Sequence, residues 1–211
     1  MEQLTRIEEK IRKNFEQKNA ARDAALAASR ELIRYCSLAI RATHRGEFDE
    51  ATKLLARERE IAAQMKNQVA AYPDLYFAGY VQDSLKELAE AHIVYALVTG
   101  GDIPDPDALG VEYAAYLNGL GEAAGELRRY SLDIIRHDNS ARVEKVLAAM
   151  EDIYALLVTM DFPDALTGGL RRTTDMVRGV LERTRGDLTV AARQEKLERT
   201  LREFEERLQG R

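Results

Sequence analysis

Cysteine, proline and aromatic residues are scarce in this 211-residue sequence, which contains one cysteine, four prolines, no tryptophan and 7% aromatic residues. The single cysteine, Cys36, cannot form a disulfide within the chain and is too few for a cysteine-based zinc or iron–sulfur site. Long apolar runs are also absent, since none approaches the roughly 18 residues that a membrane span requires. These absences argue against a disulfide-stabilised secreted scaffold and against an integral membrane protein.

An apolar signal-peptide segment is missing as well, because residues 1–17, MEQLTRIEEKIRKNFEQ, are charged throughout. We therefore expect a cytoplasmic protein with no membrane partner. Positive charge is not in excess: 31 Lys and Arg stand against 36 Asp and Glu, a formal net charge of -5. This balance disfavours a protein that coats nucleic acid by bulk charge alone, so the distribution of the charges has to be considered.

Ala, Leu, Glu and Arg dominate the composition, with 45% apolar and 32% charged residues. This composition is typical of helical proteins, and strand-like alternation of polar and apolar residues is absent. The length is sufficient for one compact domain with a substantial core. We predict an all-α fold and a single helical domain over residues 1–211.

Short polar or proline-containing breaks divide the chain into about seven segments, each long enough for a packed helix. The predicted breaks are Pro73, Pro104 with Pro106, Pro163, and residues 44–48, 137–140 and 185–188. The segment after Leu75 has an apolar stripe at three- and four-residue spacing, which predicts an amphipathic helix. The last segment carries a narrow apolar seam that suits a helical bundle or a partner subunit.

Acidic residues are concentrated between Glu87 and Leu127, where eight of them occur without a lysine or arginine. Three of these lie in a Gly/Pro turn, where aspartate caps helices. Two pairs are more informative. Glu87 and Glu90 are three residues apart, and Glu122 and Glu126 are four apart, so each pair lies on one side of its predicted helix.

The second pair shares its side of the helix with small residues, Ala115 and Gly119, which would allow another backbone or a ligand to approach closely. If both helices turned these sides to a common cleft, four carboxylates could share a hard divalent cation, Mg²⁺ or Mn²⁺. The alternative is that they form acidic surfaces facing solvent or another subunit. A ferritin-like di-iron site is disfavoured, because no Glu-x-x-His motif occurs.

Arginine is concentrated in two other segments, and arginine-rich helical faces suit phosphate contact because the guanidinium group binds oxygens bidentately. Salt bridges between subunits are the alternative interpretation. The first cluster comprises Arg30, Arg34, Arg41, His44 and Arg45. The second cluster, whose role the sequence does not define, comprises Arg171, Arg172, Arg178, Arg183 and Arg185.

Residues 116–138, YLNGLGEAAGELRRYSLDIIRHD, resemble the signature of the translin family, which includes translin and translin-associated factor X. KELAEAHIVYALV, from Lys86, resembles the central helix of that family. SRELIRYCSLAIRATHRGEFDEATKLLARERE, from Ser29, resembles its N-terminal helices. The resemblance implies a seven-helix bundle that assembles into a hollow homo-octamer and binds RNA or single-stranded DNA inside.

The two branches of the family differ in chemistry, since factor X-type subunits are Mg²⁺-dependent endoribonucleases whereas translin-type subunits bind and scaffold. In the nuclease branch, two glutamates three apart match Glu87 and Glu90. An Asp followed four residues later by a Glu matches Glu122 and Glu126, so Glu122 departs from the family pattern. The resemblance therefore implies an endoribonuclease of the factor X-like archaeal or bacterial type, with these four residues as metal ligands and catalytic groups.

Arg128 and Arg129 stand beside the second pair, and we expect them to contact RNA phosphates unless they form salt bridges between subunits. Two other functions remain open at this point. One is a non-catalytic translin-like scaffold that binds RNA or single-stranded DNA. The other is an all-α nucleotide pyrophosphohydrolase, which also uses clustered helical glutamates with Mg²⁺ and would turn over free nucleotides instead of RNA.

Overall fold

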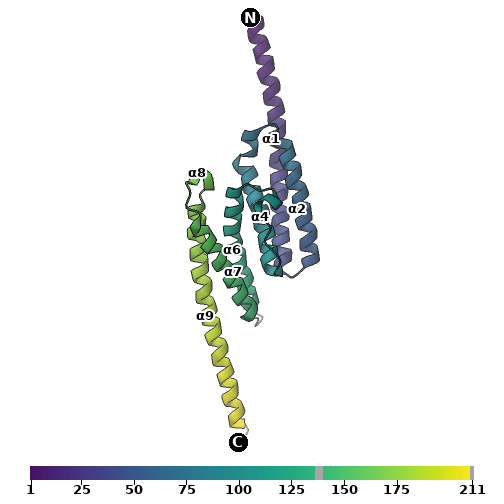
Figure 1. The fold of residues 1–211 in the computed structure, drawn as a ribbon. Helices are drawn as coiled ribbons and strands as arrows, with labels where there is room; N and C mark the ends of the chain where they lie inside the picture. The colour runs from purple at the N-terminus through teal and green to yellow at the C-terminus, as the bar shows by residue number, and fades with distance from the viewer. Residues whose placement is uncertain (136–139, 210–211) are drawn as a thin grey trace. The chain divides into compact units, whose positions relative to one another are not determined.

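The computed structural model of the chain describes residues 1–135 and 140–209 and is entirely helical in its regular elements there (Figure 1). The long helices are α1 (Glu2–His44), α2 (Phe48–Val69), α4 (Gly79–Thr99), α6 (Tyr113–Ile135), α7 (Ser140–Thr159) and α9 (Leu170–Gln209). One-turn helices lie in the connections: α3 (Pro73–Tyr76), α5 (Pro106–Leu109) and α8 (Asp164–Thr167). The all-α prediction is confirmed.

The predicted break at residues 185–188 is wrong, because α9 continues through it. A glycine inside a helix costs only about 1 kcal/mol relative to alanine. The buried stripe of α9 formed by Val177, Val180 and Leu181 continues to the fully buried Thr184, so packing outweighs the local signal of Gly186. The described residues thus contain six long helices where seven segments were expected. Residues 137–139 of another predicted break lie outside the described residues.

The remaining predicted breaks are confirmed, and their local chemistry explains why the helices end there. Gly46 and Gly100 adopt φ angles of 73° and 77°, a left-handed conformation that glycine accepts without strain. Asp105 caps α5, since the backbone N–H of Ala108 donates to its side chain at 2.7 Å. That contact gives one of the acidic residues in the turn the structural role expected of it.

The chain packs as two compact units, residues 1–119 and 120–211, and the boundary falls inside α6. In the first unit, α1, α2 and α4 pack around a core of fully buried side chains: Leu32, Ile61, Met65, Leu85, Leu88 and Ile93. The apolar stripe predicted on the segment after Leu75 faces this core, as expected from its spacing.

In the second unit α7 packs against α9, and α6 approaches both helices at Gly121. Its core consists of Leu127, Met150, Leu157, Leu170 and Val177. Gly121 of α6 lies so close to α9 that a Cβ atom there would stand 2.3 Å from Cγ2 of Thr173. The unit is therefore tightly packed at this glycine.

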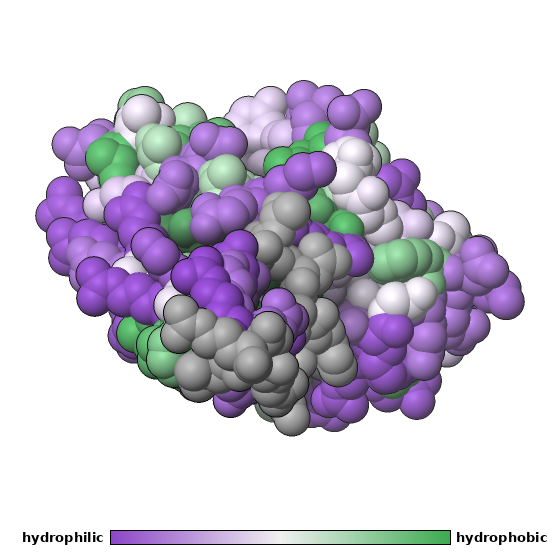
Figure 2. Space-filling view, turned by 90° about the horizontal axis from the view of Figure 1, so that it is seen from below, coloured by the Kyte–Doolittle hydropathy of each residue, from purple (hydrophilic) through white to green (hydrophobic). Residues whose placement is uncertain are grey.

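Figure 2 shows one face of the protein, on which hydrophilic residues predominate with smaller hydrophobic patches between them. Two helix ends also expose large apolar side chains in stripes: Leu4, Ile7, Ile11 and Phe15 on α1, and Val190, Leu197, Leu201 and Phe204 on α9. None of the described helices is long and apolar enough to cross a lipid bilayer.

Candidate metal-binding site

Helix α4 presents the first acidic pair on one of its sides, because Glu87 and Glu90 are three residues apart. Glu90 is buried, with 7% of its surface exposed, and Glu87 is half-buried. Lys86 Nζ lies 3.6 Å from Oε1 of Glu87. Neither glutamate is therefore fully exposed to solvent.

Helix α6 approaches this part of α4 at Gly119, where the two backbones almost touch. A Cβ atom at Gly119 would lie 2.6 Å from the carbonyl oxygen of Lys86 and 3.2 Å from the backbone nitrogen of Glu90. Glu122 follows three residues later, about one turn along α6. The prediction that the small residues of α6 allow another backbone to approach is confirmed at Gly119.

One carboxylate oxygen from each of Glu87, Glu90 and Glu122 lies within 4.8 Å of the others. Three like charges at this separation repel one another, and either protonation or a cation would relieve the repulsion. Oxygen ligands around Mg²⁺ at about 2.1 Å stand about 3.0 Å apart when adjacent and about 4.2 Å apart when opposite. The three glutamates could therefore hold a hard divalent cation after small side-chain adjustments, and the donor set fits Mg²⁺ or Mn²⁺.

Glu126, the fourth predicted ligand, lies one turn beyond Glu122 and is not part of this three-residue group. Its Oε1 lies 3.7 Å from Nη1 of Arg129 on the same helix. The spacing that suggested four equivalent ligands thus corresponds to three converging carboxylates and one neighbour. Whether Glu126 acts in chemistry stays a prediction.

The arginines of α1 differ in how far they are already paired. Arg30, Arg34 and Arg41 are exposed and share one side of the helix, and none of them makes an ion pair within residues 1–135 and 140–209. The guanidinium of Arg34 lies 5.1 Å from the ring centre of Tyr35. Arg45, by contrast, bonds to Glu47 at 2.5 Å.

The other predicted phosphate contacts already have acidic neighbours in the same chain. Arg128 Nη2 lies 2.8 Å from Asp187 and Nη1 donates to Thr184 at 3.2 Å, while Arg129 lies near Glu126. The cluster on α9 is paired in the same way for three members, Arg171 with Asp161, Arg178 with Asp175, and Arg185 with Glu151. These pairs lie within one chain, a possibility that the sequence interpretation did not consider.

A buried polar cluster of Cys36, Glu58 and His92 was missed by sequence reasoning. Glu58 is fully buried, and its Oε2 lies 3.8 Å from Nε2 of His92. Burial raises the pKa of Glu58 to about 8 and lowers the pKa of His92 to about 4. Burial and the neighbouring Glu58 also raise the pKa of the Cys36 thiol, so the cluster is uncharged near neutral pH.

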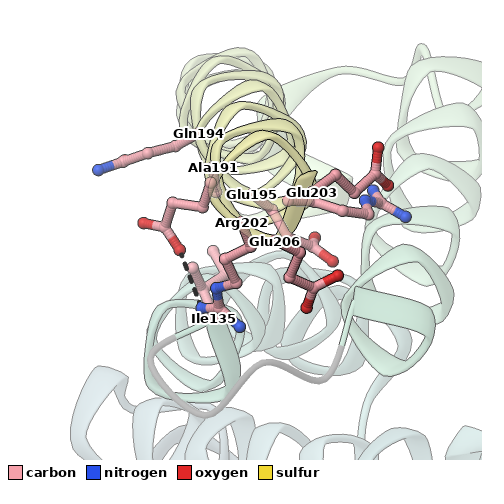
Figure 3. Close-up of a pocket in the computed structure, with 9 residues that line it drawn as sticks. Ile135, Ala191, Gln194, Glu195, Arg202, Glu203 and Glu206 are labelled. Atoms are coloured by element: carbon pink, nitrogen blue, oxygen red, sulfur yellow. Dashed lines mark ion pairs between the residues drawn. The ribbon is translucent and has the colours of Figure 1, made fainter. Parts of the chain in front are cut away.

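A groove in the second unit lies outside this site. It has a volume of about 490 Å³ and is lined by Ile135 and by charged residues of α9. Figure 3 shows the side chains of Glu195, Arg202, Glu203 and Glu206 at this groove, and Nη2 of Arg202 lies 3.8 Å from Oε2 of Glu198. None of the residues predicted from the sequence lines this groove, so it adds nothing to the three-glutamate site.

No family model matches the sequence. The uncharacterized protein MJ0175 of Methanocaldococcus jannaschii is 33% identical over 188 residues, which cover 88% of this chain and 82% of that protein. Among solved structures, AfC3PO is 35% identical with a TM-score of 0.80, covering 87% of this chain and 96% of that one. The structure of AfC3PO in complex with duplex RNA is 34% identical in sequence and has a TM-score of 0.80. The match covers 87% of this chain and 95% of that one.

The structure of apo-NeC3PO has the same fold, with a TM-score of 0.80 over 87% of this chain and 96% of that one, at 21% identity. The sequence identity to MJ0175 and AfC3PO exceeds 30% over most of each chain, and the fold of AfC3PO is shared over 87% of this chain. The residues that carry the resemblance in the sequence include the glutamates that converge in the structure. Together these findings show that the chain belongs to the translin family, which includes translin and translin-associated factor X.

Proposed function

We propose that this protein binds RNA and cleaves it as a metal-dependent endoribonuclease, with Mg²⁺ or Mn²⁺ held by Glu87, Glu90 and Glu122. The observation that carries the proposal is the convergence of their three carboxylate oxygens within 4.8 Å. The similarity to AfC3PO, which has been solved with duplex RNA, supports RNA as the polymer that is bound. We expect the protein to bind single-stranded DNA as well.

When bound, the divalent cation would lower the pKa of a water molecule and offset charge on the scissile phosphodiester. The three glutamates would hold that cation through their carboxylate oxygens. Glu90 is buried, whereas Glu87 and Glu122 are half-buried, so in this proposal the last two are the ligands open to an incoming substrate. We assign Glu126, one turn further along α6, to accept the proton of the attacking water.

Glu122 replaces the aspartate that the family pattern has, and the longer side chain could move its carboxylate away from the site. The oxygen of Glu122 nevertheless lies within 4.8 Å of those of Glu87 and Glu90. This distance supports a functional site in which the additional methylene is accommodated. It argues against reading the substitution as a loss of the metal ligand.

The exposed arginines on one side of α1, Arg30, Arg34 and Arg41, are the strongest candidates for phosphate contact, because they form no ion pair within the described residues. Arg45, Arg128 and Arg129 already have partners within the chain and would have to exchange them to contact RNA. His44 stands at the end of α1. The exposed apolar stripes of α1 and α9 support assembly into a homo-oligomer, for which the family leads us to expect an octamer.

The proposal is tested by incubating a fluorescent RNA with the protein in Mg²⁺, in Mn²⁺ and in EDTA. We expect metal-dependent cleavage that EDTA abolishes, and loss of cleavage in Glu122→Gln with RNA affinity unchanged. Glu182→Gln, which makes the same chemical change at an exposed position of α9, is the matched control and should cleave normally. Cleavage by Glu122→Gln at the parental rate would refute the assignment.

The competing function is a scaffold that binds RNA without cleaving it. The departure at Glu122 from the family pattern favours this function, although the Glu122 carboxylate reaches those of Glu87 and Glu90. The same assay separates the two functions. A scaffold retains RNA binding in every buffer and shows no metal-dependent products, whereas the proposed nuclease shows products only when the metal is present.

A further inference from the structure

We propose that Gly119 is a positioning residue of the metal site, and that its missing side chain sets the separation between α4 and α6 that lets the three glutamates converge. This inference rests on the proposed metal-dependent function. Gly119 contacts neither metal nor substrate in this account. Its role is to allow two helix backbones to meet next to the carboxylates.

The contact at Gly119 is made to the backbone of α4, which cannot move aside as a flexible side chain would. A Cβ atom there would lie 2.6 Å from the carbonyl oxygen of Lys86 and 3.1 Å from Cβ of Ala89. A normal contact between such atoms is about 3.5 Å, so even an alanine would require the helices to separate by more than about half an ångström.

The residues that touch Gly119 adjoin the metal ligands directly. Lys86 precedes Glu87 in the chain, and the backbone nitrogen of Glu90 would be 3.2 Å from the added Cβ. Glu122 is one turn further along α6 on the same side of the helix. A separation of the helices at Gly119 therefore moves Glu122 away from Glu87 and Glu90.

The metal site tolerates little of this movement. Mg²⁺ requires oxygen ligands near 2.0–2.1 Å in close to octahedral geometry, and workable sites keep ligand distances to within about 0.2 Å. A helix displacement of about half an ångström adds to the side-chain adjustment that the three glutamates already need to reach this geometry. Loss of a supporting contact around a metal site typically weakens metal affinity about 10- to 100-fold.

Two other glycines of α6 provide matched controls for the same substitution. A Cβ atom at Gly125 would meet nothing within 4 Å, so Gly125→Ala tests the chemical change alone. A Cβ atom at Gly121 would lie 2.3 Å from Cγ2 of Thr173 on α9, away from the contact with α4. Gly121→Ala therefore tests overpacking of the same helix without a clash against α4.

The experiment is a Mn²⁺ titration of each variant, followed by electron paramagnetic resonance, with thermal unfolding and RNA affinity measured in parallel. We expect Gly119→Ala to raise the dissociation constant for Mn²⁺ at least tenfold while the affinity for RNA stays unchanged. Gly125→Ala should match the parent. Gly121→Ala should unfold at a lower temperature and still bind Mn²⁺ with the parental affinity.

Parental Mn²⁺ affinity in Gly119→Ala would overturn the inference while leaving the proposed metal site intact. An equal loss of affinity in Gly121→Ala would overturn it too, because general loosening would then explain the effect. Absence of Mn²⁺ binding in the parent protein would instead refute the metal site, and the inference with it. If Gly119→Ala does not fold, the double variant Gly119→Ala with Ala89→Gly takes its place, because it removes one of the two closest contacts of the added Cβ atom. Parental Mn²⁺ affinity in the double variant would equally overturn the inference.

Discussion

The buried carboxyl group of Glu58 should make the stability of the fold fall as the solution becomes mildly alkaline. Glu58 is fully buried, and burial raises its pKa from 4.5 to about 8. Between these values the unfolded chain has lost the proton that the folded chain still holds. The free energy of unfolding therefore decreases with rising pH, by about 1.4 kcal/mol per pH unit, until the folded state also ionises near pH 8.

His92 limits the pH range in which this slope is visible. Its pKa is lowered from 6.5 to about 4, so below pH 6.5 the unfolded chain takes up a proton that the folded chain does not. This effect reduces stability as the pH falls and opposes the slope from Glu58 between pH 4.5 and pH 6.5. Between pH 6.5 and pH 8 only Glu58 contributes, and we expect a net loss of about 2 kcal/mol.

Urea unfolding followed by circular dichroism at several pH values between 6.5 and 8 measures this loss. In Glu58→Gln, which keeps the shape of the side chain and cannot ionise, the unfolding free energy should be nearly constant over that range. Glu182→Gln, at an exposed position, should retain the parental slope. A parental slope in Glu58→Gln, or a parent whose unfolding free energy does not change, would show that Glu58 does not hold its proton as its burial implies.

Replacing Arg30, Arg34 and Arg41 by alanine should weaken RNA binding, which fluorescence anisotropy measures. The slope of log affinity against log salt concentration should decrease in magnitude by about 2 to 3. Mn²⁺ affinity should stay unchanged. A matched triple variant removes three arginines that form ion pairs in the chain: Arg171, Arg178 and Arg185. An equal loss in both would show that α1 is not the RNA contact. Glu126→Gln should bind Mn²⁺ within about threefold of the parent yet cleave RNA at least 100-fold more slowly; parental cleavage would remove Glu126 from the proton transfer.

The sequence predicted the helical fold well because its helix ends carry strong local signals. Gly100 and the Pro104–Pro106 turn, for example, terminate helices through backbone conformations that few other residues adopt. The prediction failed at Gly186, where the local signal is weak and the helix is held by tertiary packing at Thr184. Periodicity alone does not report such packing.

The candidate site was predictable only in part for a similar reason. Spacing indicates that Glu87 and Glu90 lie on one side of a helix, but it does not indicate which two helices cross. Gly119 was a visible signal of close approach without revealing the partner helix. Glu58 carried a subtler signal, since it occupies a position of α2 that its buried neighbours Leu55 and Ile61 assign to the core.

A crystal structure of the parent protein grown with Mn²⁺ tests the central claim most directly. We predict an anomalous difference peak within about 2.3 Å of carboxylate oxygens from Glu87, Glu90 and Glu122, with the remaining positions filled by water. The account would be contradicted if these three side chains pointed away from one another in the electron density and no anomalous peak lay between them at millimolar Mn²⁺.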